Sequence, residues 1–330
     1  MSIPTIALVT GGYSSEAVIS YKSAITIQKH IDPSKYNLYR IDITPEKWFH
    51  TTSEGEEILV NKDDFSLTIK GRKIQFDAVF IGIHGTPGED GKLQGYFDLL
   101  RIPYTSCDAT TSAITFNKRY TVGIAGAAGF AVAKSLHLFR ENYLEKKAQV
   151  HAFKFPVFVK PNNGGSSIGM SKVASVEGLD AAIEKAFNED DQVLIEEFIA
   201  GREFTIGVFK SNGTIITLPF TEVMSQNDFF DFEAKYQGKS TEVTPAVCSE
   251  EIAQKVRNAA SGIYAVFNCR GIVRMDFIYN ETDQEPYLLE INTVPGQSDA
   301  SIVPQQVAAM GLDLKSFYAM LIDDALQLKK

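Results

Sequence analysis

A chain of 330 residues is long enough for two or three domains with a sizeable hydrophobic core. Its 44% hydrophobic and 22% charged residues are ordinary for a globular protein and argue against extensive disorder. The formal net charge of −9 argues against a broad nucleic-acid surface, because such a surface needs clustered basic residues. Any anion must therefore be bound by a local site.

The cysteines and the N-terminus indicate a cellular compartment. Cys107, Cys248 and Cys269 are widely separated and form no Cys-x-x-Cys pair, so they predict neither a disulfide framework nor a zinc site. The N-terminus lacks a basic region before an apolar core, and no apolar run approaches the ~18 residues of a spanning helix. We expect a cytoplasmic protein that binds neither membrane nor nucleic acid.

The first hundred residues predict an α/β unit with a parallel sheet. The expected elements are strands at 6–9, 38–43 and 78–83, a helix from Ser14, and a hairpin around 54–73. The turn Gly11-Gly12 separates the first strand from the helix. A boundary is expected near 103–110, where a new helix opens around Thr111.

The following residues predict an α+β region. The expected elements are a packed helix and turn at 123–133, strands at 157–160, 193–198, 204–209 and 214–218, and a helix at 178–187. Residues 228–245 are polar and aperiodic, too long for a simple connection, and suggest a lid. An amphipathic helix is expected after Ser249, its N-cap.

Two stretches near the C-terminus place polar residues two positions apart, Arg274 with Asp276 and Glu290 with Asn292. In strands, this spacing aims the polar side chains at one face. The residues that would then point into the core are Val273, Met275, Phe277, Leu289 and Ile291. Oxygen ligands without His or Cys suit Mg²⁺ and, with it, phosphate. The alternative is a hairpin with one solvated face, where such alternation is ordinary.

A glycine-rich loop at 161–169 follows Lys160 at a strand end. Glycines let the backbone approach an anion, and the lysine supplies positive charge, so the loop is suited to hold phosphate. It matches neither the P-loop nor the dinucleotide motif. The alternative is a hairpin turn with surface serines.

Three further features are ambiguous when taken singly. Glu196 could accept a purine amino proton and Glu203 could hold ribose hydroxyls, although acidic residues at strand ends are usually solvated. His84 opens a glycine-rich loop at the carboxyl edge of the sheet, where α/β folds bind ligands, but a lone histidine is more often structural. Glu16 starts the first helix, where the helix dipole alone favours an acid.

Together and in this order, the motifs resemble the ATP-grasp superfamily and, more closely, the D-alanine:D-alanine ligases of bacterial cell-wall synthesis. The resemblance covers nearly the whole chain. Its most specific parts are His84-Gly85-x-x-Gly88-Glu89-Asp90-Gly91-x-x-Gln94-Gly95, Gly165-Ser166-Ser167-x-Gly169-Met170, Glu233-Ala234-Lys235-Tyr236, Arg274-x-Asp276 and Glu290-x-Asn292-Thr293-x-Pro295-Gly296. The departures are Asn117, Gly164 and Ala300, where the family often has Asp, Glu and His.

The resemblance implies a three-domain ATP-grasp architecture of α/β and α+β parts. Residues 1–109 would form an α/β domain with the first D-alanine site, 110–200 a central domain with the glycine-rich loop, and 201–330 a C-terminal domain with the lid and metal site. The nucleotide would lie between the two α+β domains. The resemblance also implies a homodimer.

The resemblance further implies the nucleotide and metal contacts. ATP phosphates would contact Lys118, Lys160 and Lys235, with Ser166 and Ser167 in the loop that closes over them. The base would contact Glu196, Phe198, Ile199 and Phe229, and the ribose Glu203. Asp276, Glu290 and Asn292 would ligate two Mg²⁺ ions, for which Mn²⁺ could substitute.

The implied reaction activates one D-alanine as an acyl phosphate, which the amine of a second D-alanine then attacks. Glu16 would pair with the first ammonium, Arg274 and the Gly296 N–H would stabilise the oxyanion, and Ser301 would hold the second carboxylate. The remaining catalytic residues would be His84, and Ser166 and Tyr236 as a hydrogen-bonded triad with Glu16. The lid tyrosine favours a dipeptide product. The alternatives are a ligase that uses D-lactate or another D-amino acid as acceptor, and a non-catalytic nucleotide-binding regulator.

Overall fold

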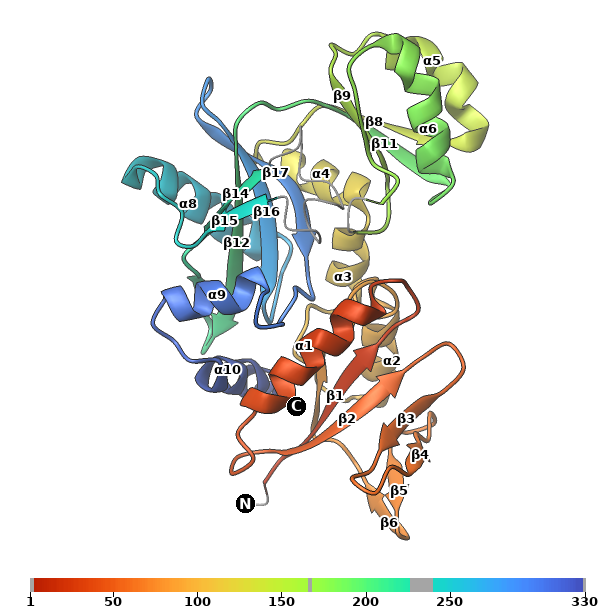
Figure 1. Cartoon of the computed structure of the whole chain (residues 1–330), viewed down its shortest axis with the longest axis vertical. Coiled ribbons are helices and arrows are strands. Elements are labelled where there is room, and N and C mark those ends of the chain that lie inside the picture. The colour runs from red at the N-terminus through yellow and green to blue at the C-terminus, as the bar shows by residue number, and fades with distance from the viewer. Residues whose placement is uncertain (1–2, 166–167, 226–239, 329–330) are drawn as a thin grey trace.

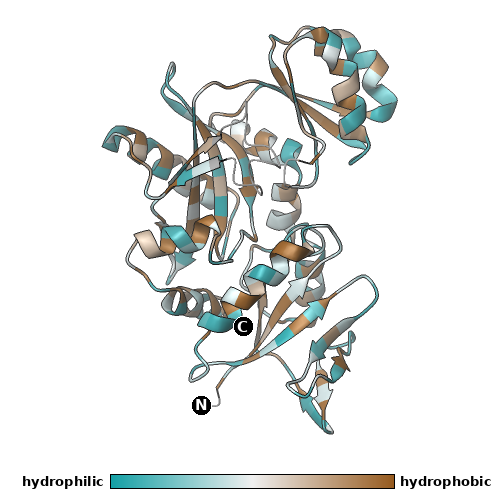
Figure 2. Cartoon of the chain, in the orientation of Figure 1, coloured by the Kyte–Doolittle hydropathy of each residue, from teal (hydrophilic) through white to brown (hydrophobic). Residues whose placement is uncertain are grey.

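The computed structural model of the chain describes residues 3–165, 168–225 and 240–328 (Figure 1). Within these residues, three larger sheets follow one another along the chain, each with flanking helices. Hydrophobic residues gather along the strands, whereas hydrophilic residues are frequent on outer helices such as α5 (Tyr143–His151) (Figure 2). The candidate residues outside the described parts are Ser166, Ser167, Phe229, Lys235 and Tyr236.

The N-terminal sheet is parallel at its centre. Its strands are β1 (Thr5–Gly11), β2 (Asn37–Ile43), β3 (Trp48–Thr51), β4 (Glu57–Leu59) and β7 (Ala78–Ile81), in the order β4-β3-β2-β1-β7. β1 pairs in parallel with β2 and β7, and α1 (Ala17–His30) packs its Ile27 with Leu8 and Phe80. The next helix is α2 (Lys92–Leu100). The predicted α/β unit is confirmed.

The hairpin expected around residues 54–73 is confirmed in part. This part of the chain forms two hairpins, β3 with β4 and β5 (Leu67–Ile69) with β6 (Arg72–Ile74). Gly55 and Gly71 adopt φ values of +83° and +79°, which glycine tolerates without steric cost. Each glycine therefore marks its own turn, and the sequence pattern merged the two.

The middle sheet is antiparallel, in the order β10-β9-β11-β8. Its elements are β8 (Ser135–Phe139), η1 (Arg140–Asn142), α5, β9 (Val157–Pro161), β10 (Ser171–Val173), η2 (Val176–Gly178), α6 (Leu179–Phe187) and β11 (Gln192–Glu197). Ile183 of α6 packs with Val159 and Ile195 on one face of the sheet. The expected strands and helix of this region are confirmed within one or two residues.

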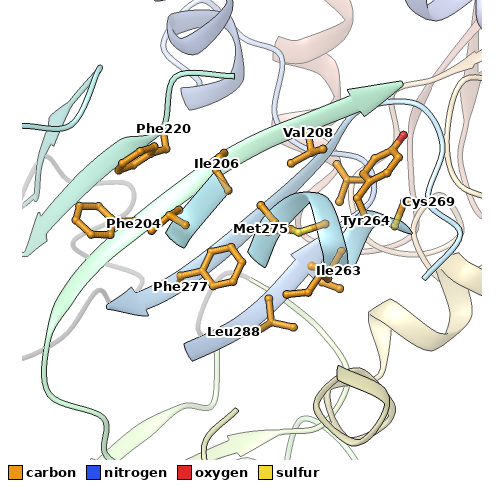
Figure 3. Close-up of a cluster of buried hydrophobic side chains, with 14 of the residues drawn as sticks. Phe204, Ile206, Val208, Phe220, Ile263, Tyr264, Cys269, Met275, Phe277 and Leu288 are labelled. Carbon is orange, nitrogen blue, oxygen red and sulfur yellow. The ribbon is translucent and has the colours of Figure 1, made fainter. Parts of the chain in front are cut away.

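The C-terminal sheet has the order β15-β14-β12-β16-β17, with β13 paired to β12. Its strands are β12 (Arg202–Ser211), β13 (Thr214–Thr217), β14 (Thr221–Ser225), β15 (Ser240–Val243), β16 (Val273–Asn280) and β17 (Glu285–Asn292). Phe204, Met275 and Phe277 pack with Ile263 and Tyr264 of α8 (Glu250–Val266), as Figure 3 shows. The Ser249 hydroxyl accepts the Ile252 N–H at 3.3 Å, so the predicted cap is confirmed.

The segment expected to be an aperiodic lid from 228 to 245 is partly regular. Residues 240–243 form β15, which pairs antiparallel with β14. Its backbone groups are therefore satisfied by a neighbouring strand, and the expectation is wrong for this end of the segment. Residues 226–239 lie outside the described parts of the chain.

The remaining helices connect the sheets. α3 (Ala109–Phe116) and α4 (Lys118–Ala127) pack against β17, while α9 (Ile302–Ala309) packs against β12. α10 (Leu314–Gln327) packs against α1 and β7, so the end of the chain lies on the N-terminal sheet (Figure 1). The Tyr36 hydroxyl donates to Asp323 at 2.5 Å, and Lys315 pairs with Asp32 at 3.0 Å. These contacts fix the C-terminal part against the N-terminal one.

Gly271 lies against the backbone of Thr105, at a contact between the C-terminal and N-terminal parts. Its φ is +64°, and an added Cβ would lie 1.8 Å from the Thr105 carbonyl oxygen. Gly213 has φ +80° with open space around it. We expect Gly213→Ala to cost about 1 kcal/mol and Gly271→Ala at least about 2 kcal/mol more. Urea unfolding of the two variants checks this, and equal losses would contradict it.

Candidate active site

Two cavities meet at the centre of the molecule. The first, about 650 Å³, is lined by the middle and C-terminal sheets; the second, about 340 Å³, is lined by the N-terminal part, β16, β17 and the loop after β17. The residues that line both are Glu16, Lys118, Gly164, Gly165, Glu203, Val223, Asp276 and Glu290. Every candidate residue in the described parts of the chain lines at least one of the cavities. Their convergence is a result of the tertiary structure.

The polar face of the β16–β17 hairpin lies at this junction. Asp276 is directly opposite Glu290 and Arg274 is opposite Asn292, so the predicted common face is confirmed. Arg274 donates from Nε and Nη2 to the two Asp276 oxygens at 3.0 and 2.9 Å. Burial alone would lower the pKa of Arg274, but Asp276 and Glu290 together hold it above its ordinary value. The guanidinium therefore stays charged and fixed.

The donor set of this face fits a hard divalent cation. Asn292 donates its amide nitrogen to Asp276 at 3.4 Å, which leaves the amide oxygen available to a metal. Two carboxylates and an amide oxygen, completed by phosphate and water, suit Mg²⁺. Among the residues that the structure describes, no group of three or more His, Cys, Asp or Glu is placed to hold a metal. A metal here would thus depend on Asn292 and on oxygens from a ligand.

Leu289 does not point into the core as expected. The pairing shifts between Asp276 and Phe277, where Asp276 faces Glu290 and Phe277 faces Leu288. This β-bulge leaves Leu289 without a partner position and turns it into the first cavity, while Leu288 is buried. Strict alternation cannot reveal the extra residue. The bulge supplies an apolar wall beside the acidic face.

The glycine-rich loop lies over both cavities. Lys118 Nζ donates to the Gly164 carbonyl at 2.6 Å, and Gly164 has φ +101°, a region that favours glycine. The Asn117 side chain accepts the Tyr120 N–H at 3.2 Å and caps α4, a role that Asp fills equally well. Gly164 and Asn117, two of the positions where this chain departs from the family pattern, therefore fit the local geometry of the loop and of α4.

The first cavity has a charged floor and apolar walls. Lys160 and Glu196 form a nearly buried ion pair at 2.5 Å, with Phe158 and Phe198 close by at 6.0 Å between ring centroids. Sequence analysis missed the walls formed by Phe158, Ile278 and Leu289. Alternation along β16 could have identified Ile278, because it shares a face with Asp276. A flat purine ring fits between such walls.

Glu16 links the N-terminal part to the glycine-rich loop. A Cβ at Gly165 would lie 2.9 Å from Glu16 Oε1, and one at Gly85 would lie 2.6 Å from Oε2. The carboxylate therefore lies between these two glycines, which let it approach both loops. Ser166, the next residue of the glycine-rich loop, lies outside the described residues.

The buried His84 and the partly buried Glu89 have opposite pKa shifts. Burial lowers the pKa of His84 to about 4, so the imidazole is neutral. Burial and the nearby Glu16 raise the pKa of Glu89 to about 8, although Glu89 accepts the Gly85 N–H at 2.7 Å and the Val294 N–H at 3.2 Å. Sequence analysis assigned no role to Glu89. Its place in the His84 loop was the available signal.

We expect His84→Gln to change how stability depends on pH. Because the folded pKa of His84 is depressed to about 4, neutral His84 stabilises the fold above pH 6.5, and this contribution is lost as the pH falls toward 4. The stability advantage of the wild type over His84→Gln should shrink by up to about 3 kcal/mol from pH 7 to 4.5. Urea unfolding at both pH values measures it. The exposed His151→Gln is the control, and a constant difference would contradict the expectation.

The loop after β17 forms the far end of the second cavity. Ser301 precedes α9, and its hydroxyl accepts the Ser298 N–H at 3.1 Å and lies 2.7 Å from the Ser298 hydroxyl. Gly296 packs closely on Ser301, since a Cβ there would lie 2.8 Å from its hydroxyl oxygen. The main-chain N–H groups and hydroxyls of this loop suit a carboxylate or an oxyanion.

Comparisons with known proteins agree with this arrangement. The family models "D-ala D-ala ligase N-terminus" and "D-ala D-ala ligase C-terminus" match residues 5–107 and 124–323. A D-alanine--D-alanine ligase of Flavobacterium johnsoniae is 45% identical over 96% of this chain and 98% of its own length.

Two solved structures share the fold. The VanG D-Ala:D-Ser ligase of Enterococcus faecalis has a TM-score of 0.89 and 32% identity over 98% of this chain and 99% of its own. The D-alanine--D-alanine ligase of Bacillus anthracis complexed with ATP has a TM-score of 0.77 and 25% identity. The likeness covers 99% of this chain and 98% of the Bacillus chain. The predicted ATP-grasp architecture is thus confirmed. None of the described helices is long and apolar enough to cross a bilayer. The chain belongs to the D-alanine–D-alanine ligase family.

Proposed function

We propose that the protein is an ATP-dependent ligase that joins two D-alanine molecules into D-alanyl-D-alanine for peptidoglycan synthesis. The observation that carries this proposal is the junction of two cavities at Glu16, Asp276 and Glu290, with Arg274 in the second cavity beside it. A nucleotide in the first cavity would direct its phosphates at an amino acid in the second. Relatives 45% identical over nearly the full length bear the same activity in their names.

The nucleotide would occupy the first cavity. Its base would lie between the walls of Phe158, Phe198 and Leu289, with Glu196 at the amino group and Ile199 beside the ring. Glu203 would hold the ribose, since it lines both cavities. The phosphates would then reach Lys118 and the glycine-rich loop. The roles of Lys160, Lys235, Ser166, Ser167 and Phe229 in nucleotide binding rest on the family resemblance.

Asp276, Glu290 and Asn292 would hold magnesium beside these phosphates. When bound, the metal neutralises the charge of the phosphate oxygens. The family resemblance implies two magnesium ions, for which Mn²⁺ could substitute. The oxygen donors of this face support the proposal, because Asp276, Glu290 and Asn292 offer carboxylate and amide oxygens, which Mg²⁺ prefers.

The first step would form D-alanyl phosphate. A carboxylate oxygen of the first D-alanine attacks the γ-phosphorus of ATP, the bond to the β-phosphate oxygen breaks, and ADP leaves. Glu16 holds the ammonium group at the cavity junction, and neutral His84 lines the same cavity without adding charge. Glu16, Ser166 and Tyr236 would form the triad that closes the loops over the intermediate and excludes water.

The second step would make the peptide bond. The neutral amine of the second D-alanine attacks the acyl carbon, the nitrogen gives up one proton to the departing phosphate or to solvent, and inorganic phosphate leaves from the tetrahedral intermediate. Arg274 and the Gly296 N–H stabilise the oxyanion, and Ser301 holds the second carboxylate, with the Ser298 hydroxyl 2.7 Å from that of Ser301. Ala300, where relatives often have His, leaves this side of the cavity without a further donor.

The acceptor is the main alternative. A structural relative at 32% identity is a D-Ala:D-Ser ligase, so the same fold serves another D-amino acid. Tyr236 at the lid position favours a dipeptide over the D-lactate ester. A regulator without catalysis is disfavoured by the presence of Arg274, both carboxylates and Asn292.

A coupled ADP-release assay with ATP, Mg²⁺ and D-alanine as the sole amino acid tests the function. We expect turnover with D-alanine and not with L-alanine, and D-alanyl-D-alanine as the product by mass spectrometry. D-Serine and D-lactate are offered as acceptors beside limiting D-alanine. A preference for D-serine or D-lactate would show that this compound, and not D-alanine, is the acceptor. ATP binding without turnover of any of these compounds would favour a non-catalytic regulator.

The domain limits 1–109, 110–200 and 201–330 remain a proposal. α3 and α4 pack against β17, and α10 packs against the N-terminal sheet, so contacts cross these limits. The homodimer and the cytoplasmic location likewise rest on the family resemblance and on composition. Sedimentation of the purified protein would settle the subunit number.

A further inference from the structure

Ser23 of α1 joins two parts of the substrate site without lining its cavity. Its side chain is completely buried. Its hydroxyl oxygen lies 2.9 Å from His84 Nε2 and accepts the main-chain N–H of Gln297 at 3.0 Å. His84 and the neighbour of Gln297, Gly296, both line the second cavity, whereas Ser23 does not. Ser23 therefore touches the supports of the site and not a substrate.

The hydrogen-bond pattern fixes the direction of the Ser23 proton. The oxygen uses a lone pair for the Gln297 N–H, so its single proton is free to point at His84 Nε2. A neutral imidazole carries one ring proton, and Nε2 cannot hold that proton while it accepts from Ser23. Neutral His84 then carries its proton on Nδ1 and accepts from Ser23 at Nε2.

The surrounding contacts make this junction rigid. One helical turn earlier, the Ser20 hydroxyl accepts the His84 main-chain N–H at 3.0 Å, and Ser20 is also fully buried. On the other side, the Gln297 amide donates to the Pro295 carbonyl at 3.2 Å, and Tyr318 of α10 donates to the Gln297 amide oxygen at 3.3 Å. The loop and the histidine are thus held between the first and the last helix.

We propose that Ser23 is a positioning residue that fixes the His84 tautomer and ties His84 to the Gly296 loop. It thereby couples the half of the site that binds the first substrate to the half that stabilises the oxyanion. The proposal rests on the ligase function for its kinetic consequences. The tautomer and the hydrogen bonds are properties of the fold alone.

Ser23→Ala tests the coupling through kinetics. It leaves His84 Nε2 and the Gln297 N–H without their partner, so we expect kcat/KM for D-alanine to fall about 10- to 100-fold. In a His84→Gln background, the same change should cost less than about 3-fold, because residues that act as a unit are not additive. Full additivity of the two changes would overturn the proposal.

Thr26→Val is the matched control. Thr26 is a buried hydroxyl residue on the same helix that donates to Asp299 at 3.1 Å, whereas His84 bonds to Ser23 and Ser20. Whatever its own effect, it should add to that of His84→Gln. Near-UV circular dichroism confirms that each variant keeps the fold.

Nitrogen NMR of ¹⁵N-histidine protein separates failure of the inference from failure of the function. The chain has five histidines, and the His84→Gln spectrum identifies the His84 signals. At neutral pH we expect a protonated Nδ1 and a bare Nε2 in the wild type, and a mixture of tautomers in Ser23→Ala. This result holds whether or not D-alanine is turned over. An Nε2-protonated wild type, or an unchanged spectrum in the variant, would overturn the proposal.

Discussion

Glu290→Gln is expected to lower kcat for D-alanine ligation by at least about 10³-fold. The change removes one of the two carboxylates of the β16–β17 face, which lie directly opposite each other. Magnesium stabilises developing charge by several kcal/mol, and each 1.4 kcal/mol is a factor of ten in rate. Glutamine has the size of glutamate and keeps one of its side-chain oxygens. The fold and the position of Arg274 should therefore be unchanged.

The measurement is ADP release as a function of Mg²⁺ concentration. We expect the Mg²⁺ dependence to shift to higher concentration as well as the rate to fall, which separates metal binding from general damage. Glu285→Gln is the control, since Glu285 lies on the same strand but is exposed and outside both cavities. A Glu290→Gln enzyme within tenfold of the wild type would show that the metal lies elsewhere.

Arg274→Lys is expected to lower kcat by about 10²- to 10³-fold with little change in the KM for ATP. Arg274 lines the second cavity but not the first, so the nucleotide contacts remain. Lysine keeps the charge but loses the planar fork that makes two bonds to Asp276 at 2.9 and 3.0 Å. The fall in kcat therefore reports on the direction of the Arg274 N–H donors and not only on the charge of the side chain.

A second arginine offers a close control. Arg40 pairs with Asp42, two residues further along β2, at 2.7 Å, in the same strand spacing but outside both cavities. Arg40→Lys should leave kcat within about twofold, because neither Arg40 nor Asp42 lines a cavity of the site. If the two variants lost the same activity, the oxyanion role of Arg274 would have to be abandoned. An increase in the ATP KM alone would assign Arg274 to nucleotide binding.

The acidic face is the part of the site that the sequence predicts best. Alternation along β16 and β17 is enough to place Arg274, Asp276, Glu290 and Asn292 on one side, because the side-chain period of a strand is two. The same rule fails at Leu289, because a bulge adds one residue to β17. The bulge arises from the register in which β17 pairs with β16, and the local sequence of β17 does not encode that register.

The sequence by itself determined the central strands of each sheet and the faces on which their polar residues lie, since these follow from local periodicity. The motifs also determined the family. Only the tertiary structure decided that Ser23, His84 and Gln297 meet, although Gln297 lies 274 positions beyond Ser23 in the chain. It also decided that the last helix packs on the first sheet and that two cavities open into each other. Such contacts depend on how whole sheets pack, and no local pattern encodes that.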